Sequence, residues 1–304
     1  MDWYAVVMRL VFEDLCQRYG GATVLDIPSL VIEAGEFFTF SGSQGCGKST
    51  ALKLIAGLEV PSVGSLMAGG RACADLQLRD REIVVIDQID QIDVLDPGTH
   101  KVVVLDEPLS GLDESQRALM GEKLRRTQAG SGTTVVYATS DSREALRLSD
   151  RLAILDGGRL RQVGTPRDLL DDPRHTAVAG FLGDPPMNIV PGILEKDGVA
   201  VEIGPRAVPL NGTIAETYAR DVFLGVRPEH VRLRPDPASG WRGTVIRVES
   251  RRERTTVEVQ VDGGRLVARE DTRRPYQIGD RVAVAIEPLH LYVFDDRGDR
   301  LDVV

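Results

Sequence analysis

The sequence predicts an α/β domain followed by an all-β domain, and three observations support this division. Up to about residue 185, short apolar runs alternate with helix-length amphipathic segments, a pattern typical of parallel βαβ units. Within that part, a glycine-rich motif at residues 42–49 stands between an apolar run and an amphipathic segment. After Pro185-Pro186, apolar and polar residues alternate with period two, which indicates a small antiparallel barrel or sandwich. We therefore expect domains at residues 1–185 and 186–304.

Composition and charge exclude several classes of protein. With 42% hydrophobic and 27% charged residues the chain has globular composition, and no apolar run approaches the ~20 residues that a membrane span requires. The first residues lack the small-residue cleavage site of a signal peptide, so we expect a cytoplasmic protein. The net charge of −9 argues against nucleic acid as a partner. Three distant cysteines imply no disulfide framework, and the four histidines show no metal-ligand spacing.

Each element has its own signal in the sequence. Four apolar runs of strand length predict buried strands in the first domain, and the segments between them have the spacing of amphipathic helices. The strands are expected at Phe37–Phe40, Ile83–Ile86, Val102–Leu105 and Thr134–Tyr137, and the helices at Ser49–Leu58, Glu114–Ala129 and Arg143–Leu148. In the second domain the alternation is clearest at Val257–Val261, Val282–Ile286 and Leu289–Val293.

The glycine-rich motif Gly42–Ser49 fits the pattern G-x-x-x-x-G-K-[ST] completely. Its glycines allow backbone N–H groups to surround phosphate oxygens, and the following helix adds its partial positive charge. Lys48 would reach the β- and γ-phosphates of a nucleotide, and the Ser49 hydroxyl would bind Mg²⁺. The motif therefore predicts a P-loop NTPase core. The alternative is a chance glycine-rich turn before a helix.

The run Val102–Leu105 ends in two acids that would complete such a site. Asp106 stands at the carboxyl end of this strand, where ligands of open α/β sheets bind, and can hold Mg²⁺ through water. Glu107 follows and can orient and polarise an attacking water, as a catalytic base does. The alternative is an acidic turn after a core strand.

With these motifs the sequence resembles the ATP-binding subunits of ABC transporters over nearly its whole length. Gly42–Thr50 is similar to the family's Walker A and Val102–Glu107 to its Walker B. The resemblance implies a RecA-like core of the ABC ATPase type, with ATP and Mg²⁺ as ligands. The nucleotide-binding residues that it implies are Gly42, Ser43, Gln44, Gly45, Cys46, Gly47, Lys48, Ser49 and Thr50.

Three of the implied positions carry alternatives. Tyr19 resembles the aromatic that stacks on adenine, and it is otherwise a core or surface aromatic. Gln88 resembles the family's Q-loop glutamine and would join Ser49 and Asp106 at Mg²⁺, but Gln91 competes for this role. Either glutamine is otherwise a polar residue after a strand. Cys46 is a small packing residue rather than a catalytic thiol, although a helix N-terminus lowers a thiol's pKa.

Further motifs are similar to one branch of the family. Gly183–Asn188 and Gly225–His230 resemble the sugar importers of the maltose and glycerol-phosphate type, whose ATP-binding subunits end in an OB-like β domain called TOBE. This resemblance implies ATP hydrolysis that drives solute import. It also implies a second ATPase subunit and transmembrane permease subunits as partners, with the chain at the inner face of the cell membrane.

The chain departs from the family between Gln88 and Asp106. Only the 17 residues 89–105 lie there, where the family has a helical subdomain that carries the signature Leu-Ser-Gly-Gly-Gln and binds the permease. No Ser-Gly-Gly occurs in this chain, and Leu109–Asp113 follows Walker B and resembles the D-loop. Such a segment is long enough for a crossover but not for several helices. We expect a truncated helical subdomain and weak coupling to a permease.

A second departure concerns the family's switch histidine. Ser140 stands at its place after the strand Thr134–Thr139, and a neutral hydroxyl cannot replace an imidazole at the γ-phosphate. Losing such a group costs ~10²–10⁴ in rate. We therefore expect ATP binding with weak hydrolysis. The alternatives are a non-hydrolysing ATP-binding regulatory module, a relic of an internal deletion, and a signature supplied only by another subunit.

Overall fold

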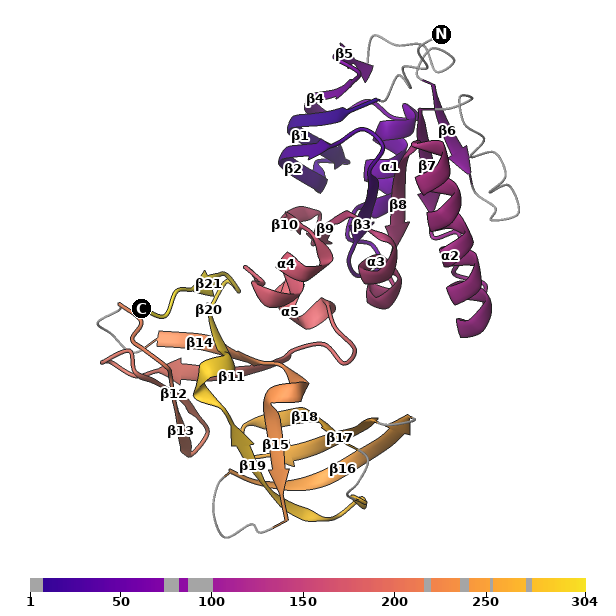
Figure 1. Ribbon diagram of the computed structural model, residues 1–304. Coiled ribbons are helices and arrows are strands. Elements are labelled where there is room, and N and C mark those ends of the chain that lie inside the picture. The colour runs from indigo at the N-terminus through magenta and orange to yellow at the C-terminus, as the bar shows by residue number, and fades with distance from the viewer. Residues whose placement is uncertain are drawn as a thin grey trace. The chain divides into compact units, whose positions relative to one another are not determined.

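The computed structural model describes residues 8–73, 82–86, 101–215, 220–235, 241–251, 254–271 and 275–304. The chain divides into two compact units, Met1–Asp171 and Asp172–Val304 (Figure 1). Residues 172–185, which the sequence assigns to the first domain, belong to the second unit by this division. Helix α5 (Thr176–Phe181) shows why, because its Ala179 is buried in one cluster with Met187 and Phe294.

The first unit is built on a mixed sheet that has ten strands in the described residues. Strands β3, β6, β7 and β8 run parallel to their neighbours at one end of the sheet, and antiparallel strands form the other end. The order is β5-β4-β1-β2-β10-β9-β3-β8-β7-β6. The bounds are β1 Leu10–Tyr19, β2 Ala22–Ile32, β3 Phe37–Ser41, β4 Val63–Ala68, β5 Arg71–Ala72, β6 Ile83–Ile86, β7 Val102–Asp106, β8 Thr134–Thr139, β9 Arg151–Asp156 and β10 Arg159–Gly164.

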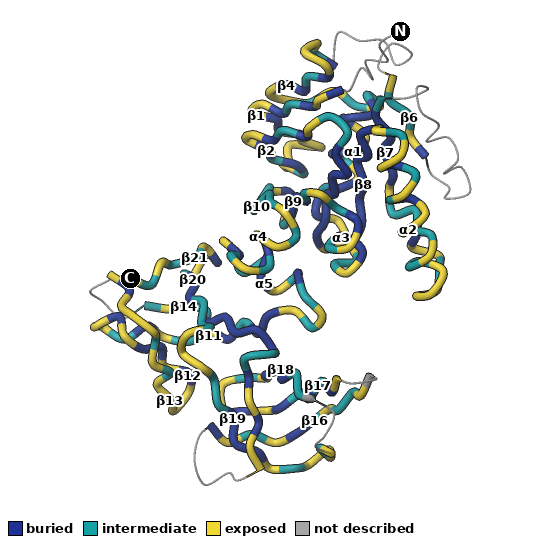
Figure 2. The backbone as a smooth tube through the Cα atoms, in the orientation of Figure 1, coloured by how far each residue is buried: buried dark blue, intermediate teal, exposed yellow. Residues whose placement is uncertain are grey.

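Helices pack on both faces of the parallel strands. The helices are α1 (Lys48–Ala56), α2 (Glu114–Ser131), α3 (Ser142–Leu148) and α4 (Pro166–Asp171). Successive strand residues point to opposite faces, so Val104 joins the core under α1 while Val103 and Leu105 join the core under α2 and α3. The four strands predicted in this domain are all present. The apolar runs of β3, β7 and β8 reflect burial on both faces (Figure 2), whereas β6 at the edge of the sheet is only partly buried.

The second unit is all antiparallel β apart from α5 and short 3₁₀ turns in the described residues. One sheet has the order β13-β12-β11-β14-β20-β21 and the other β15-β19-β16-β17-β18. Turns η4 (Pro228–His230) and η5 (Pro288–His290) lead from one strand to the next. The strands are β11 Asn188–Leu194, β12 Ala200–Ile203, β13 Arg206–Pro209, β14 Arg220–Val226, β15 Val231–Arg234, β16 Trp241–Arg251, β17 Arg254–Val261, β18 Gly264–Asp271, β19 Arg281–Ile286, β20 Leu291–Asp295 and β21 Arg300–Leu301. The expectation of an α/β part followed by an all-β part is confirmed.

Candidate nucleotide-binding site

The loop between β3 and α1 has a backbone that only glycine fits. Gly42, Gly45 and Gly47 have φ angles of 144°, 80° and 107°. A Cβ atom at Gly42 would clash with the carbonyl oxygen of Leu155, and one at Gly47 would lie 2.8 Å from the carbonyl oxygen of Val24. The glycines therefore permit both the curvature of the loop and its close contact with neighbouring strands.

Lys48 extends into this loop from the first turn of α1. Its side chain is 5% exposed, and its Nζ donates hydrogen bonds to the carbonyl oxygens of Gly42 at 2.9 Å and Ser43 at 3.0 Å. The same Nζ lies 3.8 Å from Oε1 of Glu107. The ammonium group is thus held at the centre of the loop, where a phosphate would meet it.

The two acids that follow β7 differ in how they are held. Asp106 ends the strand with an exposed side chain. Glu107 has a φ of 45°, which is unusual outside glycine and costs on the order of 1–3 kcal/mol. Its backbone N–H donates to the carbonyl oxygen of Ala138 at 2.9 Å, which ties it to the end of β8. Strained backbone of this kind is typical of functional sites.

One cavity of about 520 Å³ contains most of the predicted residues. This volume lies in the range of cofactor sites. The Ser49 hydroxyl and the Asp106 carboxylate both line the cavity, and oxygen donors of these kinds are the ligands that Mg²⁺ prefers. The lining residues are Tyr19, Val24, Gln44, Gly45, Gly47, Lys48, Ser49, Thr50, Asp106 and Glu107.

Comparison with known proteins identifies the family. The ABC transporter family model matches residues 25–128, the MalK OB fold domain residues 183–231 and the TOBE domain residues 224–294. The xylose/arabinose import ATP-binding protein XacK of Haloferax volcanii is 31% identical to this chain, over 96% of this chain and 95% of that protein. This chain belongs to the ATP-binding proteins of ABC transporters.

Other relatives and a solved structure agree with this assignment. The sn-glycerol-3-phosphate import ATP-binding protein UgpC of Cereibacter sphaeroides is 30% identical, over 96% of this chain and 99% of that protein. The trehalose/maltose import ATP-binding protein MalK of Thermococcus litoralis is 29% identical, over 95% of this chain and 97% of that protein. A bacterial Atm1-family ABC exporter with ATP bound superposes with a TM-score of 0.50 at 16% identity, over 58% of this chain and 42% of that chain, which shows the fold alone.

The ABC ATP-binding chain therefore has the P-loop ATPase domain and the OB-like TOBE region that its sequence predicts. The alignment with XacK spans 367 positions, more than the 304 residues of this chain, so that protein has residues without a counterpart here. In the structure, β6 ends at Ile86 and its parallel neighbour β7 begins at Val102. Gln88 and Gln91 lie in this connection, outside the described residues.

Tyr19 lies at the rim of the cavity rather than in the core. It is 45% exposed, and its hydroxyl donates to a carboxylate oxygen of Glu59, an interaction that raises the pKa of the phenol. An exposed ring beside the phosphate loop fits a base-stacking role better than a packing role. Val24 of β2, which lines the same cavity, was missed, because a valine in a strand carries no signal for ligand contact.

Four of the predicted residues that the structure describes do not line the cavity: Gly42, Ser43, Cys46 and Ser140. Cys46 is 2% exposed in the core beneath the loop, and burial raises the pKa of its thiol. This thiol is therefore a packing group, and the alternative of a lowered pKa is wrong. Gly42 and Ser43 instead offer their carbonyl oxygens to Lys48.

Ser140, which we expect at the position of the family's switch histidine, is exposed just after β8 and does not line the cavity. The next residue, Asp141, caps α3 and forms an ion pair with Arg117 at 2.8 Å. Arg117 also donates to the carbonyl oxygen of Leu112 at 3.0 Å, which connects the segment after β7 to this turn. Arg117 was missed in the sequence, because its partners are remote along the chain or part of the backbone.

Among the described residues, no helix has both the length and the apolar character needed to cross a bilayer.

Proposed function

We propose that this chain is the ATP-binding subunit of an ABC importer for a carbohydrate or sugar phosphate, and that it binds Mg-ATP in the cavity around Lys48. The observation that carries the proposal is the convergence of the phosphate loop, Asp106, Glu107 and Tyr19 on one cavity. Relatives named for the import of xylose and arabinose, glycerol 3-phosphate, and trehalose and maltose support the class of solute. Tyr19 stacks on the adenine, and Ser49 and Asp106 bind Mg²⁺.

The partners that follow from this role are a second ATP-binding subunit and transmembrane permease subunits. The chain then works on the cytoplasmic face of the membrane, where it is held by the permease rather than by a span of its own. The short connection between β6 and β7 leaves little chain for a surface that docks on a permease. We therefore expect the coupling to transport to be weak.

Hydrolysis by the isolated chain is expected to be slow. Glu107, whose carboxylate lies 3.8 Å from Nζ of Lys48, is the proposed base, but Ser140 offers no imidazole to the γ-phosphate. The signature motif, which in the family completes the site of the opposite subunit, is missing from the sequence.

Two measurements on the purified chain test this proposal. The first is ATP binding by calorimetry in the presence of Mg²⁺, and the second is steady-state release of phosphate. We expect saturable binding that Lys48→Ala weakens, with phosphate release close to that of the same variant. Absence of binding would reject the proposed site, and steady release abolished by Lys48→Ala would reject slow hydrolysis.

A second candidate function is that of a non-hydrolysing ATP-dependent regulatory module. The replacement of the switch histidine by Ser140, together with retention of the complete phosphate loop, favours it. Dimerisation that requires ATP but releases no phosphate would support the module. Phosphate release only when a complete ABC subunit is added would support a signature supplied in trans. The junction 87–100, on which the relic hypothesis depends, lies outside the described residues.

A further inference from the structure

Two turns of the second unit share a short sequence pattern. Arg227-Pro228-Glu229-His230 and Glu287-Pro288-Leu289-His290 each place a proline two residues before a histidine. Each forms a 3₁₀ turn in which the histidine N–H donates to the carbonyl oxygen three residues earlier, at 2.9 Å in η4 and 3.1 Å in η5. Each histidine is therefore fixed at the point where a strand begins.

The strand register brings these two turns together. Val226 of β14 pairs with Leu291 of β20, and Val231 of β15 pairs with Ile286 of β19. The register is the same in both antiparallel pairings. The turn between β14 and β15 therefore lies opposite the turn between β19 and β20. By that register His230 lies opposite Glu287, although the two residues are 57 positions apart in the sequence.

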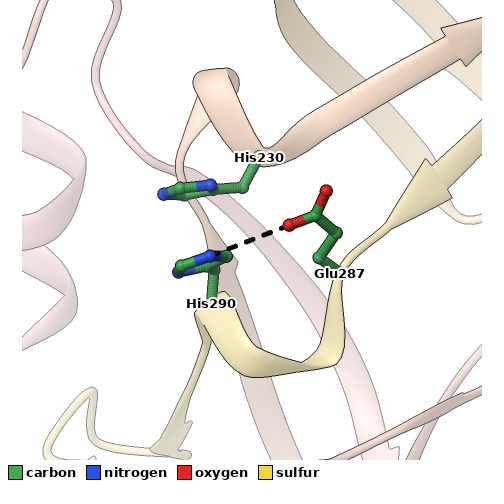
Figure 3. A group of neighbouring side chains, drawn as sticks. All are labelled: His230, Glu287 and His290. Carbon is green, nitrogen blue, oxygen red and sulfur yellow. Dashed lines mark ion pairs between the residues drawn. The ribbon is translucent and has the colours of Figure 1, made fainter.

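The side chains confirm this juxtaposition (Figure 3). The rings of His230 and His290 stack with centroids 3.7 Å apart and planes 9° from parallel. Nε2 of His290 lies 3.7 Å from Oε2 of Glu287. One donor atom from each of the three residues lies within 4.8 Å of the others. Both imidazoles are half-buried while the carboxylate is exposed, so the group is open to an ion from solution.

We propose that His230, His290 and Glu287 bind a divalent transition-metal ion of the zinc type. Two imidazoles and one carboxylate are a ligand set for such ions, and a water completes four-coordination. A metal lies in the plane of each imidazole that it binds, so binding requires one of the stacked rings to rotate. Arg232, whose Nε lies 3.9 Å from Glu287, is the cation that the metal must displace from this carboxylate.

The ion would connect the two places where the chain passes between the sheets of the second unit. β14 and β20 belong to one sheet, and β15 and β19 belong to the other. The site is independent of the phosphate loop and of ATP. The sequence shows no metal-ligand spacing among the histidines, because the strand register joins residues that are far apart in the chain.

The test is titration of the full chain, free of nucleotide, with ZnCl₂ by calorimetry, and with CoCl₂ by visible absorption. We expect one zinc ion per chain and cobalt bands of the intensity that four-coordinate sites show. His230→Gln, His290→Gln and Glu287→Gln should each weaken zinc binding at least tenfold. Glu229→Gln is the matched control, since Glu229 lies in η4 but pairs with Arg269 at 4.0 Å. Asp106→Asn should bind zinc as wild type does, which would show that the zinc does not bind at the nucleotide site.

The midpoint of thermal unfolding distinguishes a variant that is misfolded from one that has only lost a zinc ligand. Wild type should gain thermal stability on addition of ZnCl₂, whereas Glu287→Gln, an exposed substitution, should match wild type without zinc and gain nothing with it. The proposal is overturned if the wild-type chain shows no saturable zinc binding. It is equally overturned if both histidine variants bind zinc as tightly as wild type, or if Asp106→Asn abolishes the binding.

Discussion

Lys48 is a buried cation whose hydrogen bonds all go to its own loop. Two carbonyl oxygens and the nearby Glu107 carboxylate surround its charge. The glycines of the loop have the positive φ angles that turn backbone N–H groups inward, which a phosphate would need. At the residue scale the site is therefore pre-organised.

Lys48→Ala should weaken ATP binding about 10–100-fold, since a hydrogen bond to a charged group contributes about 1.5–3 kcal/mol. Calorimetric titration with Mg-ATP measures this loss. Lys53→Ala is the matched control, because Lys53 lies in α1 and pairs with Glu59 at 3.6 Å instead. Equal affinities of Lys48→Ala and wild type would contradict the assignment.

Gly47→Ala should destabilise the fold more than Gly45→Ala. Both glycines have positive φ, so each substitution introduces backbone strain of about 1–3 kcal/mol. Only at Gly47 would the new Cβ lie 2.8 Å from a backbone oxygen, that of Val24, whereas Gly45 has open space. Urea unfolding measures the loss of stability in each variant. Gly45→Ala reports the cost of backbone strain alone, and the additional loss in Gly47→Ala reports the steric contact with Val24. A Gly45→Ala variant less stable than Gly47→Ala would show that the contact is unimportant.

Glu144 makes stability depend on pH. It is 4% exposed, burial raises the pKa of its carboxyl, and it accepts a hydrogen bond from Tyr137. A carboxyl with a higher pKa in the folded than in the unfolded chain stabilises the fold while protonated, and this contribution is lost as the pH rises through the folded pKa. Glu144→Gln, which keeps an acceptor oxygen, should therefore gain stability relative to wild type as the pH rises above the ordinary glutamate pKa of about 4.3.

Urea unfolding at several pH values measures this trend, with the exposed Glu114→Gln as the control. A stability difference between Glu144→Gln and wild type that is constant with pH would argue against the raised pKa.

At the element scale, the parallel strands lie at the centre of the core of the first unit. Tyr137 of β8 and Leu105 of β7 are fully or almost fully buried, and helices cover both faces of these strands. Helix α2 contributes little apolar surface, because its only buried residues are Gly121, Leu124 and Gln128. Its position depends on the capping box at Asp113 and on this narrow face.

Leu124→Ala should lower the free energy of unfolding by about 2–5 kcal/mol, because it leaves a cavity beneath α2. Leu119→Ala on the same helix should change it by less than about 0.5 kcal/mol, since Leu119 is 70% exposed. Chemical denaturation measures both values. Similar losses in the two variants would mean that α2 packs differently.

How far the sequence predicts the structure differs between elements and sites. The strand at Val102–Leu105 and the phosphate loop follow from local apolar runs and one contiguous motif. The contacts of Arg117 and the pairing of His230 with His290 do not, because they depend on register between strands or turns far apart in the chain. Likewise the unit boundary at 171/172 depends on the packing of α5, whereas the composition changes only after Pro185.

At the scale of the whole molecule, our proposal of slow hydrolysis rests on two separate features, the short connection between β6 and β7 and the serine at position 140. We expect that restoring one of them alone does not restore hydrolysis. The two units also have separate cores, so a variant in the TOBE region need not alter the phosphate loop.

Ser140→His should therefore leave phosphate release by the isolated chain unchanged, because the signature motif is still missing. In the presence of a complete ABC subunit, the same substitution should raise the rate, by up to the ~10²–10⁴ of a positioned proton-transfer group. Phosphate release with and without that subunit provides the measurement. A large increase in the isolated chain would show that hydrolysis here needs no signature.

The close contacts of the phosphate loop also determine the order in which parts of the first unit fold during synthesis. Leu155 and Gly158 pack against the loop region and β2, and the N–H of Asp26 donates to the carbonyl oxygen of Gly158 at 2.6 Å. A nascent chain that has emerged from the ribosome only as far as α1 has the Walker motif but not the hairpin that supports it. Contacts of such long sequence separation form slowly. The phosphate loop is therefore fully supported only after the β9–β10 hairpin has packed against it.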